Sequence, residues 1–302
     1  MTIRFDGRVA IVTGGGRGLG RSHALALGRL GAHVVVNDTG GGLDGQGSND
    51  NVAEAVVAEI RAAGGEGVAD FHDVSTHDGG QGVVQTAVDA YDTVDIVVNN
   101  AGYLRDRTFG KIELDDFDAI IGVHLLGNTY PTHAAWPIMR TKEYGRVVFT
   151  TSAAGLYGNF GQTNYAAGKL AVVGLMNALK LEGDSKGIRV NTIAPVATTR
   201  MTESLMGDDV SLYDPGWVTP AVVYLCSDEC EASGAVVEAG GGYYSLAQMM
   251  EGAGVVIDAD QVTPDDIAAR WSQITDMTDA APYRSATDIT TRIAGLLEAD
   301  QS

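Results

Sequence analysis

Residues 8–20 read RVAIVTGGGRGLG, and this stretch decides the fold. Val9 to Val12 are apolar and mostly β-branched, as in a strand that is buried on both faces. Three glycines follow directly, and a helix is predicted from Gly18 onward. Glycines permit a tight turn and let backbone N–H groups approach a pyrophosphate at the positive end of a helix. The turn predicts cofactor contacts for Gly14, Gly16, Arg17, Gly18, Leu19 and Gly20.

Short β-branched runs alternate with longer amphipathic segments from Arg8 to Thr199, the order expected of a parallel sheet. Strand candidates are RVAIVTG, AHVVVND, EGVADFHDV, VDIVVNN, GRVVFTTS and IRVNTIAP, with GAVVEAGGG later in the chain. Helices are predicted at Gly18–Leu30, Asn51–Ala63, Gly82–Ala90, Leu114–Met139 and Asn164–Asp184. The predicted fold class is α/β: a doubly wound parallel sheet (Rossmann) of about seven strands with helices on both faces.

The alternation stops after Gly242, which predicts a main domain over residues 1–242 and a C-terminal extension over 243–302. Thr263 with Asp266 resembles a capping box, so a helix is expected from there to Ile274. A second helix is expected at Ala286–Glu298. The extension is too small to be an independent fold, and we expect it to pack on the core. The polar stretch Thr39–Asp50 is predicted to be an inserted surface loop.

Composition excludes several functions for this chain of 302 residues. A net charge of -19 argues against nucleic acid as a partner, because such proteins use clustered Lys and Arg. No apolar run approaches the ~18 residues of a membrane span, and no signal peptide is evident. We therefore expect a soluble, cytoplasmic protein with no membrane partner. Cys226 and Cys230 lie four apart, on one face of an expected helix, and are interpreted as packing residues; no metal site is predicted.

Asp38 closes the second predicted strand, eighteen residues after Gly20. At about this spacing a carboxylate accepts hydrogen bonds from the adenosine ribose and repels a 2'-phosphate, which favours NAD over NADP. Two alternatives remain at this point. Asp38 can simply be a turn former, and Arg17 and Arg21 can instead bind a 2'-phosphate.

Tyr165 and Lys169 lie four residues apart, so a helix from Asn164 places both side chains on one face. A neighbouring ammonium favours phenolate, lowering the tyrosine pKa so that it can act as a general base. Ser152 ends a predicted strand thirteen residues earlier, where its hydroxyl can hold a substrate oxygen. Taken alone, such a Tyr–Lys pair is usually surface decoration.

Five motifs together resemble the short-chain dehydrogenase/reductase family over residues 5–240: TGGGRGLG, NNAG at 99–102, Ser152, YxxxK at 165–169 and NTIAP at 191–195. The resemblance implies catalytic roles for Ser152, Tyr165 and Lys169. It also implies cofactor contacts, on the adenine by Asp73 and Val74, on the nicotinamide ribose by Lys169, and elsewhere by Tyr165, Asn100, Ala101, Gly102 and Pro195.

His124 departs from this pattern, because most family members carry an asparagine of the catalytic tetrad there. If that asparagine acts through its backbone carbonyl, a histidine substitutes without loss, and we favour this interpretation. Alternatively, the imidazole alters the proton relay, or His124 merely packs against a helix.

Longer segments resemble a narrower group, the (3R)-hydroxyacyl-CoA dehydrogenase part of peroxisomal multifunctional enzyme type 2. They include VVVNDTGG, NNAGYLRDRTF, VHLLGNTYPTHAAWPIM, NTIAPVATTRMT, CSDEC and VTPDDIAARW. The resemblance implies a stand-alone NAD-dependent dehydrogenase that oxidises a (3R)-3-hydroxyacyl-CoA to the 3-oxoacyl-CoA. Alternatives are a hydroxysteroid dehydrogenase acting on a free ring alcohol and an NAD-binding protein without turnover.

Substrate recognition is expected at two segments, 153–161 and 196–217, since both leave the carboxyl ends of strands. The second contains Met201, Leu205, Met206 and Trp217, and forms either a mobile apolar lid or a packed helix. The pocket suits a fatty or a steroidal acyl group. Candidates for CoA phosphate contacts are Arg105, Arg107 and Arg200. The resemblance also suggests a homodimer or homotetramer, with the extension lying across the interface.

Overall fold

The protein is described by a computed structural model that covers residues 3–42, 44–49, 51–197, 214–257 and 261–300. The chain divides into two compact units, residues 1–246 and 247–302. The sequence predicted a boundary after residue 242, four residues before the observed one. The difference arises because one further strand follows residue 242.

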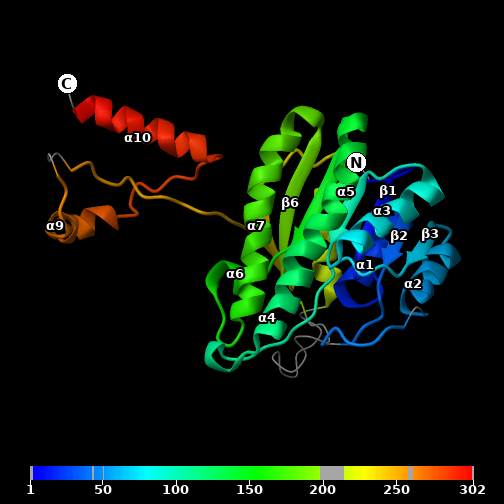
Figure 1. Ribbon diagram of the computed structural model, residues 1–302. Coiled ribbons are helices and arrows are strands. Elements are labelled where there is room, and N and C mark those ends of the chain that lie inside the picture. Colours follow the sequence, from blue (N-terminus) through cyan, green and yellow to red (C-terminus); the bar gives the residue numbers. More distant parts are fainter. Residues whose placement is uncertain (1–2, 43, 50, 198–213, 258–260, 301–302) are drawn as a thin grey trace. The chain divides into compact units, whose positions relative to one another are not determined.

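An eight-stranded sheet forms the centre of the first unit, in the order β3-β2-β1-β4-β5-β6-β7-β8 (Figure 1). All paired strands from β3 to β7 run parallel. The doubly wound fold is thus confirmed, with one strand more than predicted. The strands are β1 Val9–Thr13, β2 His33–Asn37, β3 Glu66–Asp70, β4 Ile96–Asn99, β5 Gly145–Thr150, β6 Ile188–Pro195, β7 Val236–Gly240 and β8 Tyr243–Ala247.

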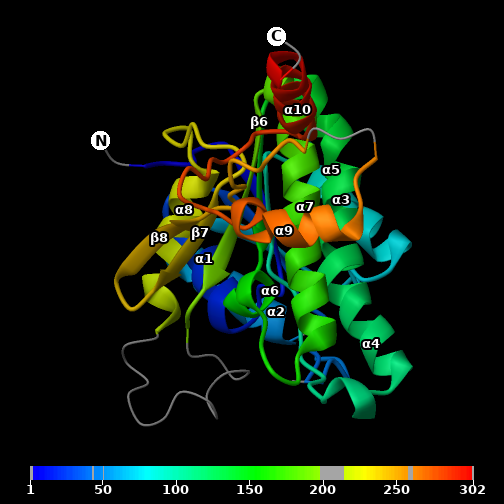
Figure 2. The same ribbon diagram turned by 90° about the vertical axis from the view of Figure 1, so that its left-hand side faces the viewer.

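Helices cover both faces of the sheet (Figures 1 and 2). One face carries α1 (Gly18–Arg29), α2 (Asn51–Ala62) and α8 (Thr219–Cys226), and the other carries α3 (His77–Tyr91), α4 (Leu114–Ile121), α5 (Gly127–Lys142) and α7 (Thr163–Gly183). Short α6 (Ala153–Tyr157) packs on α7. The strand order reverses between β1 and β4, which places a crevice at their carboxyl ends.

Three helix predictions differ from the structure. The single helix expected over 114–139 is interrupted by a π-helical turn, Gly122–Leu126. Helix α3 starts at His77 instead of Gly82, because the Thr76 side chain caps it by accepting the Gly79 N–H. The shared helical face predicted for Cys226 and Cys230 is wrong, because α8 ends at Cys226; both thiols are nevertheless buried in the core.

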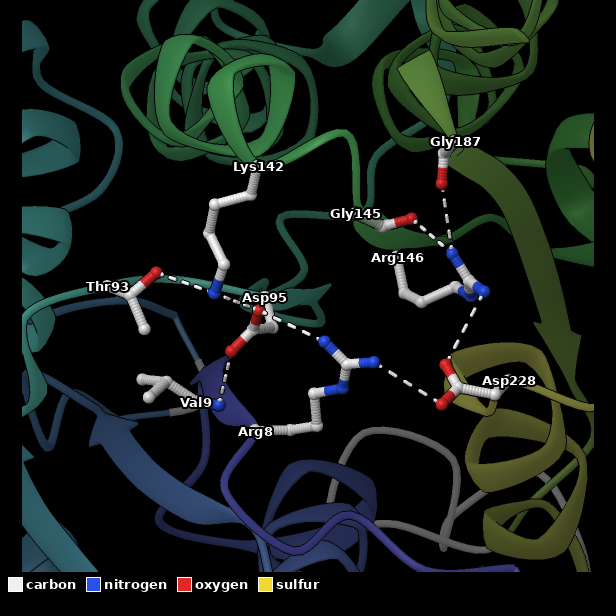
Figure 3. Close-up of polar contacts among 9 residues, drawn as sticks. All are labelled: Arg8, Val9, Thr93, Asp95, Lys142, Gly145, Arg146, Gly187 and Asp228. Atoms are coloured by element: carbon white, nitrogen blue, oxygen red, sulfur yellow. Dashed lines mark hydrogen bonds and ion pairs between the residues drawn. The ribbon is translucent and has the colours of Figure 1, made fainter. Parts of the chain in front are cut away.

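A network of charged side chains lies at the amino-terminal ends of β1, β4 and β5, opposite the crevice (Figure 3). The fully buried Asp95 accepts the first backbone N–H of β1 at 2.9 Å and pairs with Lys142 and Arg8. Arg8 and Arg146 both reach Asp228, at 3.3 and 3.7 Å. The network fixes the chain segments that enter three central strands.

Two helices lie in the described part of the second unit. Helix α9 (Pro264–Ile274) begins with the predicted capping box of Thr263 and Asp266, and α10 spans Ala286–Asp300. An antiparallel bridge joins Glu251 to Ala281. How the extension packs on the main domain stays a prediction. No helix in the described part of the chain is long and apolar enough to cross a membrane.

Candidate active site

The glycine turn after β1 is fastened to the NNAG segment after β4. Asn100 donates its side-chain amide to the carbonyls of Thr13 and Gly14, both at 3.1 Å. The Thr13 hydroxyl in return accepts the backbone N–H groups of Asn100 and Ala101. Gly14 has φ +60, and a Cβ on it would lie 2.8 Å from the Ala101 Cα. Two motifs more than eighty residues apart therefore form one cradle.

Helix α1 begins at this cradle with its amino end open toward the crevice. Its N-cap, Arg17, makes no side-chain capping bond among the described residues, and the first turn holds no acidic side chain. A Cβ on Gly20 would lie 2.1 Å from the Gly14 carbonyl oxygen, so only glycine brings the helix this close to the turn. A helix end of this kind offers backbone N–H groups and a positive dipole to a phosphate.

Asp38 lies directly after β2 at the edge of the turn. Its carboxylate accepts the Gly16 N–H at 2.9 Å and the Gly40 N–H at 2.7 Å. Arg17 and Arg21, the alternative candidates for binding a 2'-phosphate, both have other partners. Arg17 donates to the Gly41 carbonyl, and Arg21 pairs with Glu59. This arrangement agrees with a negative charge at the ribose position.

A cavity of about 480 Å³ opens at the carboxyl ends of these strands. Most of the predicted cofactor residues line it, namely Gly14, Gly16, Arg17, Gly18, Leu19, Asp38, Asp73, Val74, Asn100, Ala101 and Gly102. Four predicted residues do not line it: Gly20, Pro195, Tyr165 and Lys169. Residues that sequence reasoning did not assign to it also contribute, including Asn37, His72, Ser75, Tyr103 and Val123, with Gly41, Gly42 and Gly45 from the inserted loop. The glycine cradle and this cavity fit a dinucleotide.

Ser152, Tyr165 and Lys169 come together beside the carboxyl end of β5. Ser152 is the N-cap of α6, and its hydroxyl accepts the Ala154 N–H at 3.2 Å. Tyr165 and Lys169 lie on the first turns of α7, with the Lys169 Nζ 5.7 Å from the Tyr165 ring centroid. Lys169 is buried and donates to the Thr150 carbonyl at 2.6 Å. The predicted shared face of Tyr165 and Lys169 is present.

The electrostatics of this group differ from the sequence-based expectation. Burial lowers the pKa of Lys169 to about 7, because the charged ammonium is withdrawn from water. Burial likewise raises the pKa of Tyr165, while a hydrogen bond with Ser152 acts in the opposite direction and Asp106 adds to the rise. The predicted lowering of the Tyr165 pKa by Lys169 is therefore wrong for the chain by itself. Desolvation is the largest cause of the shift in the Tyr165 pKa, and Lys169 is not among its causes.

Comparison with known proteins places this arrangement in a family. The profile of the short chain dehydrogenases matches residues 8–209. The chain belongs to the short-chain dehydrogenase family. A short-chain type dehydrogenase/reductase of Mycobacterium tuberculosis is 47% identical over 90% of this chain and 96% of that protein. Peroxisomal multifunctional enzyme type 2 of Mus musculus is 43% identical over 98% of this chain.

The solved structure of full-length peroxisomal multifunctional enzyme type 2 from Drosophila melanogaster has the same fold. It superposes on 98% of this chain with a TM-score of 0.83 and 36% identity. This chain spans 40% of the length of the mouse enzyme and 50% of the Drosophila chain. It is an oxidoreductase related to the dehydrogenase domains of these larger enzymes, as the sequence resemblance predicted.

His124 of this dehydrogenase lies in the π-helical turn, 1% exposed. Its Nε2 lies 2.8 Å from the Tyr103 carbonyl, and its ring meets that of Tyr165 edge to face, with centroids 5.0 Å apart. Its own carbonyl accepts the Asn128 amide at 2.8 Å. Both the side chain and the backbone of His124 are thus engaged.

The predicted CoA ligands have different surroundings. Arg105 pairs with Asp116 at 2.9 Å and donates to the Asp44 carbonyl, so its guanidinium already has partners. Arg107 is exposed and its backbone bridges to Gln162. Arg200, Met201, Leu205 and Met206 lie outside the described residues, so the lid is neither supported nor opposed. Trp217, at the end of that segment, is 46% exposed.

Sequence reasoning missed the residues that hold Tyr165 in place. Gln162 donates to the Asp106 carboxylate at 2.7 Å, and the Asn164 side chain donates to the Arg105 carbonyl at 3.1 Å. The loop before α7 is thereby tied to the loop after β4. The only signal in the sequence was the cluster of amide side chains just before Tyr165.

Proposed function

We propose that this dehydrogenase oxidises a (3R)-3-hydroxyacyl-CoA to the 3-oxoacyl-CoA, with NAD as the hydride acceptor. The observation that carries the proposal is the meeting of Ser152, Tyr165 and the buried Lys169 beside a dinucleotide-sized cavity. It occurs in a chain that resembles peroxisomal multifunctional enzymes along nearly its whole length.

Each of the three side chains has a distinct part in the proposed chemistry. The Ser152 hydroxyl holds the substrate oxygen, and Tyr165 removes the hydroxyl proton as the C3–H electron pair leaves as hydride. Lys169 stands 5.7 Å from the phenol ring and, when protonated, stabilises the phenolate form. NAD, when bound, supplies the electron-deficient nicotinamide carbon that accepts the hydride.

Asp38 supports NAD over NADP in this proposal. Its carboxylate accepts the N–H groups of Gly16 and Gly40 and lines the cavity at the end where we place the adenosine ribose. A 2'-phosphate there would meet this carboxylate, while Arg21 is paired with Glu59 and Arg17 donates to the Gly41 carbonyl.

The acyl-CoA substrate is supported by the resemblance rather than by a described pocket. The names of relatives include a peroxisomal hydratase-dehydrogenase-epimerase of Saccharomyces cerevisiae, 40% identical over 92% of this chain. The exposed aromatic side chains Tyr157 and Phe160, in the segment expected to shape the substrate, suit an apolar acyl group. Assembly as a homodimer or homotetramer remains part of the proposal.

An NADH-formation assay over 3-hydroxyacyl-CoA thioesters tests the proposal. Short, long and steroidal acyl groups are compared in both 3-hydroxy configurations, with Tyr165→Phe as the inactive control and NADP as the second cofactor. We expect turnover of the 3R thioesters with NAD and a loss of at least about a hundredfold in Tyr165→Phe.

Two results would contradict the proposal. A higher kcat/KM for a free hydroxysteroid than for its CoA thioester would indicate a ring-alcohol dehydrogenase. Binding of NAD with no turnover of any alcohol would indicate a non-catalytic protein.

A further inference from the structure

His124 stands between two parts of the site that the chain forms separately. It belongs to the π-helical turn that joins α4 to α5, and its side chain is almost completely buried. On one side lies the loop after β4, whose Gly102 and Tyr103 line the cavity. On the other side lies α7 with Tyr165. A π-turn inside a long helix is a costly local geometry that often marks a functional position.

The hydrogen bond to Tyr103 fixes the state of the imidazole. A carbonyl oxygen only accepts, so Nε2 carries the proton and donates across 2.8 Å. The ring is neutral, since burial first and the charge of Lys169 second hold its pKa well below the ordinary value. Nδ1 is then an acceptor, and it has no partner among the described residues.

The other contacts of the ring leave it little freedom. Its plane is 89° to that of Tyr165, an edge-to-face arrangement that holds the phenol ring as well as the imidazole. A Cβ on Gly102 would lie 2.2 Å from the His124 Cε1, so the loop after β4 is pressed directly against the ring. A Cβ on Gly168 would lie 3.0 Å from the His124 Cβ, so α7 approaches equally closely.

We propose that His124 is a positioning residue that holds both the cofactor loop and Tyr165, through two separate parts of its ring. The Nε2–H group anchors the loop after β4 at the Tyr103 carbonyl. The edge-to-face contact between the two rings orients the phenol of Tyr165. This goes beyond a backbone role for residue 124 and rests on the proposed function where it treats Tyr165 as the base.

Two substitutions separate the two contacts. His124→Gln places an amide N–H at the reach of Nε2 but removes the ring, whereas His124→Phe keeps a ring and removes the donor. His133→Gln and His133→Phe are matched controls, because His133 is exposed on α5. The measurements are the Kd for NADH by fluorescence, kcat with a 3-hydroxyacyl-CoA, and thermal unfolding.

We expect His124→Phe to weaken NADH binding about fivefold, the effect of one lost hydrogen bond, and to lower kcat less than His124→Gln does. We expect His124→Gln to keep NADH affinity within about twofold and to lower kcat about fivefold, the effect of one lost ring contact. His124→Asn is too short for the first contact and lacks the second, so both quantities should fall. It serves as the second variant if His124→Phe does not fold.

Equal losses of affinity and kcat in the Gln and Phe variants, or a lowered melting temperature alone, would mean that His124 only fills space. The measurement of the Kd for NADH needs no substrate. If the wild-type chain turns over no thioester, the proposed function fails, while an absent difference in NADH affinity between the Phe and Gln variants still overturns the anchoring role.

Discussion

The buried imidazole of His23 makes the free energy of unfolding depend on pH. His23 lies on the buried face of α1, 1% exposed, with Nδ1 2.9 Å from the Thr219 hydroxyl. Burial lowers its pKa to about 3 from an ordinary value of 6.5. Between these two values the unfolded chain binds a proton that the folded chain does not.

The sign and size of the effect follow from this difference. The contribution of His23 to stability is complete above its unfolded pKa of 6.5 and is lost as the pH falls toward about 3. Each pH unit in that window lowers the free energy of unfolding by roughly 1.4 kcal/mol. Acidification from pH 7 to pH 5 crosses about 1.5 units of the window, so it should cost about 2 kcal/mol.

Urea unfolding at pH 7 and pH 5 measures this cost in the wild type and in His23→Asn. Asparagine offers Thr219 a polar partner without an ionisable group, so the variant should lose about 2 kcal/mol less than the wild type on acidification. His124, buried in both proteins, contributes equally and cancels. His133→Asn serves as the exposed control and should behave like the wild type. Equal acid losses in the wild type and His23→Asn would refute the burial of this face of α1.

Three further substitutions test the cofactor cradle and the opposite edge of the sheet. Asp38→Asn removes a charge that would act on a 2'-phosphate with about 1–4 kcal/mol, so the kcat/KM preference for NAD over NADP should drop at least about tenfold; an unchanged ratio would remove the basis for NAD. Asn100→Ala loses two hydrogen bonds to the turn at Thr13 and Gly14, and NADH affinity should fall about tenfold in calorimetry, whereas unaltered affinity would show that the turn holds its shape alone. Asp95→Ala leaves Lys142 and Arg8 without their buried partner, so urea unfolding should show a loss of about 3 kcal/mol with NADH affinity kept; a change in affinity would contradict the separation of the two edges.

The sequence was sufficient for the long, strongly patterned elements and for the residues of the cradle. Runs of β-branched residues such as Val34–Val36 predict buried parallel strands. The glycine turn lies where the strand pattern ends and the helix pattern begins. Gly14 has a positive φ, a local reason for glycine in a tight turn between a strand and a helix. The backbone geometry of such motifs depends on neighbouring residues, so the spacing of residues along the sequence predicts it.

What the sequence did not predict depends on contacts between distant segments. The π-helical turn that interrupts the 114–139 helix at Gly122 contains the buried His124, whose carbonyl accepts the Asn128 amide. The early start of α3 passes through Gly79 and Gly80, which look like helix breakers; a Cβ on Gly80 would lie 2.3 Å from the Tyr130 Cβ. Gly80 is therefore required by the close packing of α5, whereas a Cβ on Gly79 would lie 1.9 Å from the Asp73 carbonyl oxygen.

The same reasoning explains why the pKa expectation for Tyr165 had the wrong sign. A spacing of four residues predicts that an ammonium lies near the phenol, and it does. It gives no information on how much water surrounds the two groups, and desolvation depends on everything packed around them. Here burial moves the Lys169 pKa down and the Tyr165 pKa up, so each group is pushed toward its neutral form. In the proposed function, the positive charge of an oxidised nicotinamide would act in the opposite direction and favour the phenolate.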